Sequence, residues 1–192
     1  ALTDPAEEEA VLAVQLFGSE PDCMAHQAAR IAKRLGDRLA LIDVNMGCPV
    51  RKVVRRGEGS ALMQTPKLAA DIIRSIVDVP VTAKFRSGWT NEEKNAVDFA
   101  KRLEQAGASL VSVHGRSARQ MYRGNADWDV IAQVKEAVAI QYADYDKNPS
   151  TPTEELNPSW HMYSRGYTLS DVFAENPDWF AMSYKSFCGL LQ

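Results

Sequence analysis

The sequence predicts an α/β fold built on parallel strands. Three observations lead to this class: four short segments are almost wholly apolar, each is followed by apolar residues at helical spacing, and Gly or Pro punctuates the units. Strands that are apolar on both faces are typical of parallel sheets covered by helices. Strand–helix units in series are joined by right-handed crossovers, so we expect one continuous parallel sheet.

The strands and helices follow one another in a regular order. Strands are expected at residues 11–17, 39–45, 81–86 and 109–114. Ser19 is expected to cap the first helix, with Asp22 at the third position of a capping box. Pro66 opens the second helix, a further capping box at residues 90–93 precedes the third, and Asp127 caps the fourth.

Side-chain parity separates a doubly wound sheet from part of a barrel. Because strand side chains alternate between faces, Asn45 shares a face with Asp43, and Lys84 shares one with Thr82. The alternate residues of each strand are purely apolar. In a barrel the outer face meets the helices, while inward polar groups gather at the carboxyl rim. We therefore expect a partial TIM (β/α)8 barrel with about four βα units and a non-matching C-terminal tail.

Length and composition fit one ordinary domain. The chain has 192 residues, is 45% hydrophobic and carries a net charge of −3, so it is not basic overall. Its cysteines, Cys23, Cys48 and Cys188, are odd in number and do not form the framework of a secreted disulfide protein, which favours the reducing cytoplasm. No metal site is expected.

The ends of the chain give two further expectations. No apolar run approaches the roughly 18 residues that a membrane span needs, and no signal peptide opens the sequence, so no membrane association is expected. The chain starts at Ala1 without Met, which indicates a fragment or a processed end.

Four polar residues at strand ends are expected at one rim: Gln15, Asn45, Lys84 and His114. Gln and Asn present paired donors and acceptors that suit the edge of a flat heterocycle. Lys84 is costly to bury alone, so it should face an anion or an electron-rich ring, or pair inward with Asp43. His114 can donate to a phosphate or a ring oxygen. Together these groups suit a phosphorylated aromatic cofactor.

Cys48 lies in a turn bounded by Gly47 and Pro49, directly after the second strand. A strand end fixes the position of a reactive group, and a loop leaves it accessible. We interpret Cys48 as the chemical centre. The alternative is that it is a small buried hydrophobe, which is the usual role of a free cysteine.

Several motifs resemble those of the tRNA-dihydrouridine synthases, in order and at family spacing, from about residue 11 to 140. They are Gln15-Leu16-Phe17-Gly18, Asp43-Val44-Asn45-Met46-Gly47-Cys48-Pro49, Gly57-Glu58-Gly59-Ser60-Ala61-Leu62, Lys84-Phe85-Arg86-Ser87-Gly88-Trp89 and Val113-His114-Gly115-Arg116. The resemblance implies an FMN-binding barrel that reduces uridine to 5,6-dihydrouridine in tRNA and uses NADPH to reload the flavin. It implies flavin contacts at Gln15, Lys84 and His114, a position at flavin and substrate for Asn45, and a general acid at Cys48.

Two basic loops follow strand ends and are expected to hold tRNA phosphates beside the site. The first loop contains Arg51, Lys52, Arg55 and Arg56; the second contains Arg116, Arg119 and Arg123. The alternative for each arginine is ordinary solvated charge. The substrate base must leave the folded tRNA to reach a flavin inside a barrel.

The chain departs from the family pattern at its two ends. We divide it into a partial FMN-binding barrel domain, residues 1–140, and a C-terminal segment of unknown origin, residues 141–192, with a short helix expected at Asn176-Pro177-Asp178. The glycine-rich segments that would cradle the FMN phosphate do not follow residue 140. Open sheet edges there predict self-association.

Two other functions remain open from the sequence. One is another FMN-dependent barrel oxidoreductase, similar to a dihydroorotate dehydrogenase. The other is an inactive remnant that serves as an RNA-binding module.

Overall fold

The computed structural model describes residues 11–144 and 161–163 of the chain. These residues form one sheet in the order β1-β2-β3-β4-β5-β6, so each strand lies beside its neighbour in sequence. The strands are β1 Leu12–Leu16, β2 Leu39–Met46, β3 Val81–Arg86, β4 Leu110–His114, β5 Gln141–Asp144 and β6 His161–Tyr163. The first five run parallel, and β6 pairs antiparallel with β5.

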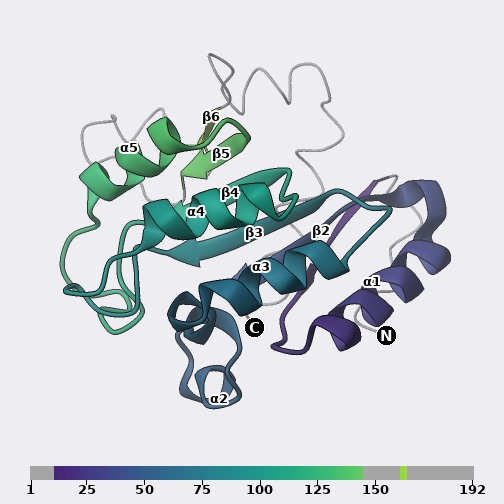
Figure 1. The fold of residues 1–192 in the computed structure, drawn as a ribbon, viewed down its shortest axis with the longest axis horizontal. Helices are drawn as coiled ribbons and strands as arrows, with labels where there is room; N and C mark the ends of the chain where they lie inside the picture. Colours follow the sequence, from purple (N-terminus) through teal and green to yellow (C-terminus); the bar gives the residue numbers. More distant parts are fainter. Residues whose placement is uncertain (1–10, 145–160, 164–192) are drawn as a thin grey trace.

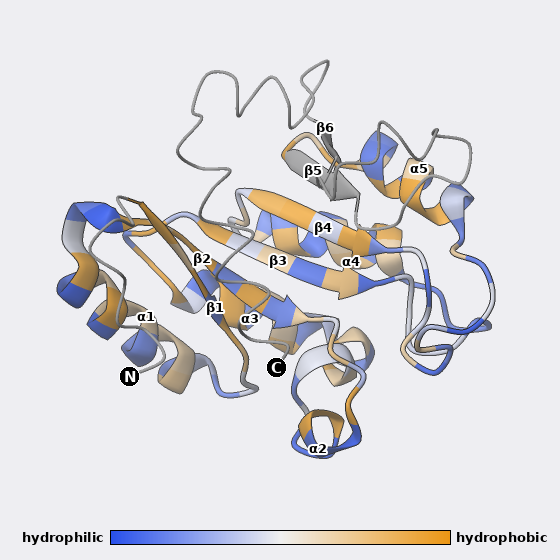
Figure 2. Cartoon of the chain, turned by 180° about the vertical axis from the view of Figure 1, so that it is seen from behind, coloured by the Kyte–Doolittle hydropathy of each residue, from blue (hydrophilic) through white to orange (hydrophobic). Residues whose placement is uncertain are grey.

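The main helices form a single layer on one face of this sheet (Figures 1 and 2). They are α1 Pro21–Leu35, α3 Pro66–Ser75, α4 Ala96–Gln105 and α5 Trp128–Ala137, and each packs against the next. A doubly wound sheet places helices on both faces, whereas sequential strands with one-sided helices form a barrel wall. The expected partial barrel is confirmed, and β5 adds a parallel strand to the four predicted ones.

The hydrophobic core lies between the sheet and the helix layer. Six alternate strand residues face the helices with 0% exposure: Ile42, Val44, Ala83, Phe85, Val111 and Val113. Phe85 meets Phe99 of α4, with ring centroids 5.0 Å apart. Because successive strand side chains point to opposite faces, this packing directs Asp43, Asn45 and Lys84 to the other face.

Two predicted helix caps are wrong. Helix α1 is preceded by Glu20, and the Ser19 hydroxyl instead donates to the Arg56 carbonyl at 3.2 Å. Helix α4 begins at Ala96, although Thr90 Oγ1 accepts from the Glu93 N–H in a local turn. The Thr90 hydroxyl accepts within a turn, which uses the same chemistry as a helix cap, whereas the Ser19 hydroxyl donates to a carbonyl far away in the chain.

The other two predicted starts are confirmed. Pro66 occupies the first turn of α3, and the Asp127 carboxylate accepts from the Val130 N–H at 3.1 Å at the start of α5.

Short helical segments were not predicted between the main elements. They are η1 Gly36–Arg38, a 3-10 helix after α1, α2 Arg51–Val54, directly after the Cys48 turn, and η2 Gly59–Gln64, another 3-10 helix. Such short turns carry too few residues for a periodic signal.

The fold predictions for the C-terminal segment mostly concern residues outside the described ranges. The short helix at Asn176-Pro177-Asp178 and most of the C-terminal segment belong to them. Among the helices of the described part, none has the length and apolar character to cross a bilayer.

We predict that Phe99→Ala lowers the free energy of unfolding by about 3–5 kcal/mol, because it opens a cavity in the layer between sheet and helices. Chemical denaturation followed by circular dichroism measures the change. Val77→Ala is the matched control, since the Val77 side chain is 67% exposed and its loss should change stability little. Equal effects of the two substitutions would contradict the described core.

Candidate functional site

The four predicted rim residues lie on the sheet face that carries no helices. Gln15 is in register with Asp43, and Asn45 is in register with Lys84. His114 is in register with Arg86, two residues beyond Lys84 on β3. The four side chains therefore form a diagonal row rather than one level. A diagonal follows from the stagger between neighbouring strands of a barrel.

A continuous set of hydrogen bonds connects the Gln15 and Asn45 end of this row. Asp43 accepts from Gln15 Nε2 at 2.6 Å and from Thr82 Oγ1 at 2.7 Å. Gln15 Oε1 accepts from Asn45 Nδ2 at 3.0 Å. Burial raises the pKa of Asp43 above its usual value, and the hydrogen bonds from Thr82 and Gln15 and the charge of Lys84 offset part of that rise.

The backbone of the Cys48 turn is held by hydrogen bonds to Asn45 and Ser60. Asn45 Oδ1 accepts from the N–H groups of Gly47 and Cys48 at 3.1 and 2.9 Å. The Cys48 carbonyl accepts from the Ser60 N–H at 3.0 Å. Gly59 has φ +59°, and an added Cβ there would lie 2.7 Å from the Cys48 carbonyl oxygen, so only glycine fits beside the turn.

Cys48 itself is partly exposed. Partial exposure does not fit the alternative that it is a small buried hydrophobe. Its fixed backbone and accessible side chain are what a group that reacts with a bound molecule requires.

Arg86 is a site residue that the sequence analysis missed. Its side chain is buried, at 2% residue exposure, and Nε donates to the Gly47 carbonyl at 2.8 Å. Its Nη1 donates to the carbonyls of Ser117 and Met121 at 3.2 and 2.7 Å, and the guanidinium lies 5.5 Å from the Tyr122 ring centroid. Arg86 thus connects the Cys48 turn to the loop after β4. Its parity with Lys84 was the signal that could have identified it.

His114 is buried and electrically neutral. Its Nδ1 accepts from the Arg116 N–H at 3.1 Å, which places the ring proton on Nε2. Burial and then the positive charges of Lys84, Arg86 and Arg116 lower its pKa to about 3. His114 can therefore donate one hydrogen bond from Nε2 without carrying charge.

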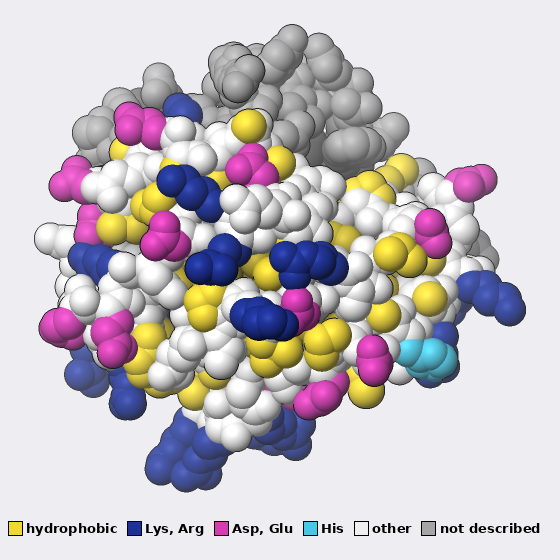
Figure 3. Space-filling model, viewed as in Figure 1, with side chains coloured by type: hydrophobic (Ala, Val, Ile, Leu, Met, Phe, Trp, Pro, Cys, Tyr) yellow, Lys and Arg dark blue, Asp and Glu magenta, His cyan; other side chains and the backbone are white. Residues whose placement is uncertain are grey.

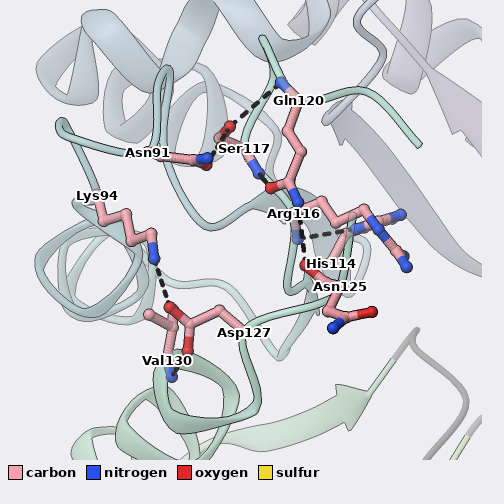
Figure 4. Close-up of polar contacts among 9 residues, drawn as sticks. All are labelled: Asn91, Lys94, His114, Arg116, Ser117, Gln120, Asn125, Asp127 and Val130. Atoms are coloured by element: carbon pink, nitrogen blue, oxygen red, sulfur yellow. Dashed lines mark hydrogen bonds and ion pairs between the residues drawn. The ribbon is translucent and has the colours of Figure 1, made fainter. Parts of the chain in front are cut away.

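The loop after β4 is folded on itself by polar contacts (Figure 4). Both Nε and Nη2 of Arg116 donate to the Gly124 carbonyl at 3.1 Å. Gln120 Nε2 donates to the Asn125 carbonyl at 3.0 Å, and its Oε1 accepts from the Ser117 N–H. The Arg116 guanidinium binds its own loop, which fits neither ordinary solvated charge nor a cation fully available to a tRNA phosphate; its expected contact with RNA stays a prediction.

The other basic residues are more accessible. Arg119 is exposed and lies 5.2 Å from the Trp89 ring centroid. Basic side chains also gather over α2, at the lower end of the molecule in Figure 3. This group, which we name the α2 basic patch, consists of Arg51, Lys52, Arg55 and Arg56, all exposed.

We predict that the imidazole of His114 stays neutral from pH 8 down to about pH 4, because its pKa in the fold is about 3. NMR titration of the ring carbon shifts measures this. A midpoint near pH 6.5, as in an unfolded peptide, would contradict the buried, cation-flanked ring.

The same shift makes stability depend on pH. Between the unfolded pKa near 6.5 and the folded value of about 3, the unfolded chain binds the proton and the fold does not, so acidification through this window destabilises the fold. His114→Asn should remove that part of the pH dependence. Asp43 acts in the opposite sense, because its raised pKa makes the fold bind a proton earlier than the unfolded chain.

Comparison with known proteins agrees with this geometry. Residues 2–143 match the family model described as dihydrouridine synthase. The chain is 44% identical over 140 residues to a probable tRNA-dihydrouridine synthase 1 of Synechocystis, covering 71% of this chain and 38% of that protein. It is 45% identical over 136 residues to tRNA-dihydrouridine synthase B of Shewanella oneidensis, covering 69% and 41%.

The chain spans about two fifths of the length of these curated relatives. The matched region runs through β1 to β4 and into β5, and includes every site residue described above. The chain belongs to the dihydrouridine synthase family and forms part of its TIM barrel.

Proposed function

We propose that this chain is the part of a tRNA-dihydrouridine synthase that contains the catalytic turn and one side of the flavin site. The reaction is the reduction of uridine to 5,6-dihydrouridine in tRNA with FMN and NADPH. One observation supports it above all: Asn45 belongs both to the diagonal row of polar groups and to the hydrogen bonds that fix the Cys48 turn.

The donor set on this face fits a flavin. It contains two amide side chains, an ammonium group and a neutral imidazole, which are types of group that suit the polar edge of a flat ring. Ser112 lies level with Lys84 on β4, and its buried Oγ has no hydrogen-bond partner among the described residues. A buried hydroxyl without a partner is costly, so a polar ligand beside it would restore the missing bond.

In this proposal FMN would be held by Gln15, Asn45, Lys84 and His114, and its reduced form would supply a hydride for C6 of the uracil ring. Cys48 Sγ would donate a proton to C5 as a general acid. The partly exposed side chain of Cys48 allows this contact with an extruded base. Arg86 and Asn45 keep the turn in place by their bonds to its backbone.

The α2 basic patch supports the choice of RNA as substrate. Its four exposed cations follow the catalytic turn directly, where they could neutralise phosphates next to an extruded base. In the loop after β4, Arg119 is exposed and its guanidinium lies near the Trp89 ring. Arg116 instead binds the backbone of its own loop.

We predict that Cys48→Ala, made in a protein that includes the whole barrel, keeps flavin binding and lowers the rate of dihydrouridine formation by about 10²–10⁴-fold, the usual contribution of a general acid. Single-turnover assays on unmodified tRNA measure the rate, and flavin absorbance measures binding. Cys23→Ala is the control, because Cys23 is exposed on α1. A normal rate for Cys48→Ala would exclude Cys48 as the acid.

We predict that changing all four residues of the α2 basic patch to Gln weakens tRNA binding and flattens its salt dependence, by roughly 0.7–0.9 in log–log slope for each lost phosphate contact. Fluorescence anisotropy over a salt series measures both. Lys101→Gln with Arg102→Gln is the control, since these residues are exposed on α4. If the control weakens binding equally, the patch has no special role.

A further inference from the structure

Three side chains on the helix-free face form a directed chain of hydrogen bonds, which we name the amide relay: Asp43, Gln15 and Asn45. It starts at the Asp43 carboxylate, passes through both amide groups and ends on the backbone N–H groups of Gly47 and Cys48. The bond from Gln15 to Asp43 measures 2.6 Å and that from Asn45 to Gln15 measures 3.0 Å. The bonds from the Gly47 and Cys48 N–H groups to Asn45 measure 3.1 and 2.9 Å.

The direction of the relay is fixed from its Cys48 end. Backbone N–H groups only donate, so the Asn45 atom that faces them must be the oxygen Oδ1. Asn45 Nδ2 then faces Gln15, which must offer its oxygen. Gln15 is left with Nε2 at the far side, and this group needs an acceptor.

A carboxylate at position 43 meets this need because it can only accept hydrogen bonds when ionised. Thr82 Oγ1 donates to its other oxygen at 2.7 Å, which fixes the carboxylate plane from the neighbouring strand. We infer that Asp43 is a positioning residue: through Gln15 and Asn45 it sets the orientation of the amide group that holds the Cys48 turn. The value of this role for catalysis rests on the proposed function, but the relay itself does not.

The test is amide hydrogen exchange of the full chain, read by NMR at Gly47 and Cys48. Asp43→Leu keeps a side chain of similar size and removes the acceptor, so protection at both amides should fall about tenfold, as expected for a lost hydrogen bond. Protection at Ile42 and Ser109, which donate to Pro80 and Val81, should stay unchanged and reports that the sheet is intact.

Two further variants separate the relay from general damage. Asp43→Asn should keep protection near the parent value, because its carbonyl can still accept from Gln15 while the Thr82 hydroxyl turns to accept from the new amide. Thr82→Val should also keep it, because the bond from Gln15 to Asp43 remains. Should Asp43→Leu lose the sheet, Gln15→Leu removes the next link on β1 and has the same predicted effect.

Unchanged protection at Gly47 and Cys48 in a folded Asp43→Leu or Gln15→Leu variant would overturn the inference. An equal loss in Thr82→Val would also overturn it, since the path would then not run through Gln15. Dihydrouridine formation is measured separately. If exchange follows the relay while Cys48→Ala remains active, the relay stands and the proposed role of Cys48 fails.

Discussion

The strict alternation of side chains along parallel strands is the constraint on which this structure depends. Ile42, Val44 and Phe85 are fully buried against the helix layer, and their burial fixes the faces of β2 and β3. A register change of one residue would bury Asn45 and Lys84 among apolar helices and expose these core residues. The hydrophobic core therefore also determines which groups meet at the site.

Burying polar and charged groups on one face costs desolvation free energy, and Arg86, His114 and Asp43 are each stabilised there in a different way. Arg86 remains charged and is bound to backbone carbonyls of two loops. His114 gives up its charge, because burial and neighbouring cations favour the neutral ring. Asp43 is bound by Thr82 and Gln15. The result is a polar surface held in a defined geometry, in which each group is oriented before a ligand arrives.

The sequence was sufficient for the parts of the fold that follow from periodicity. Strand positions, the one-sided polar row and the start of α5 at Asp127 follow from alternation and capping chemistry. It was insufficient where one side chain can serve in two ways. Thr90 matches a capping pattern but accepts within a turn, and Ser19 matches one but donates to the distant Arg56 carbonyl. The roles of Arg86 and Arg116 depend on carbonyls far away in the chain or across a loop, and no local pattern records such partners.

The central claim is that Gln15, Asn45 and Cys48 meet on the helix-free face of the sheet. NOE measurements on the isotope-labelled chain test this most directly. We predict cross-peaks between the side-chain amide protons of Gln15 and Asn45, and between those of Asn45 and the backbone N–H of Cys48. Cross-peaks from either amide to the apolar residues of α3 or α4, with none to the Cys48 turn, would contradict the account.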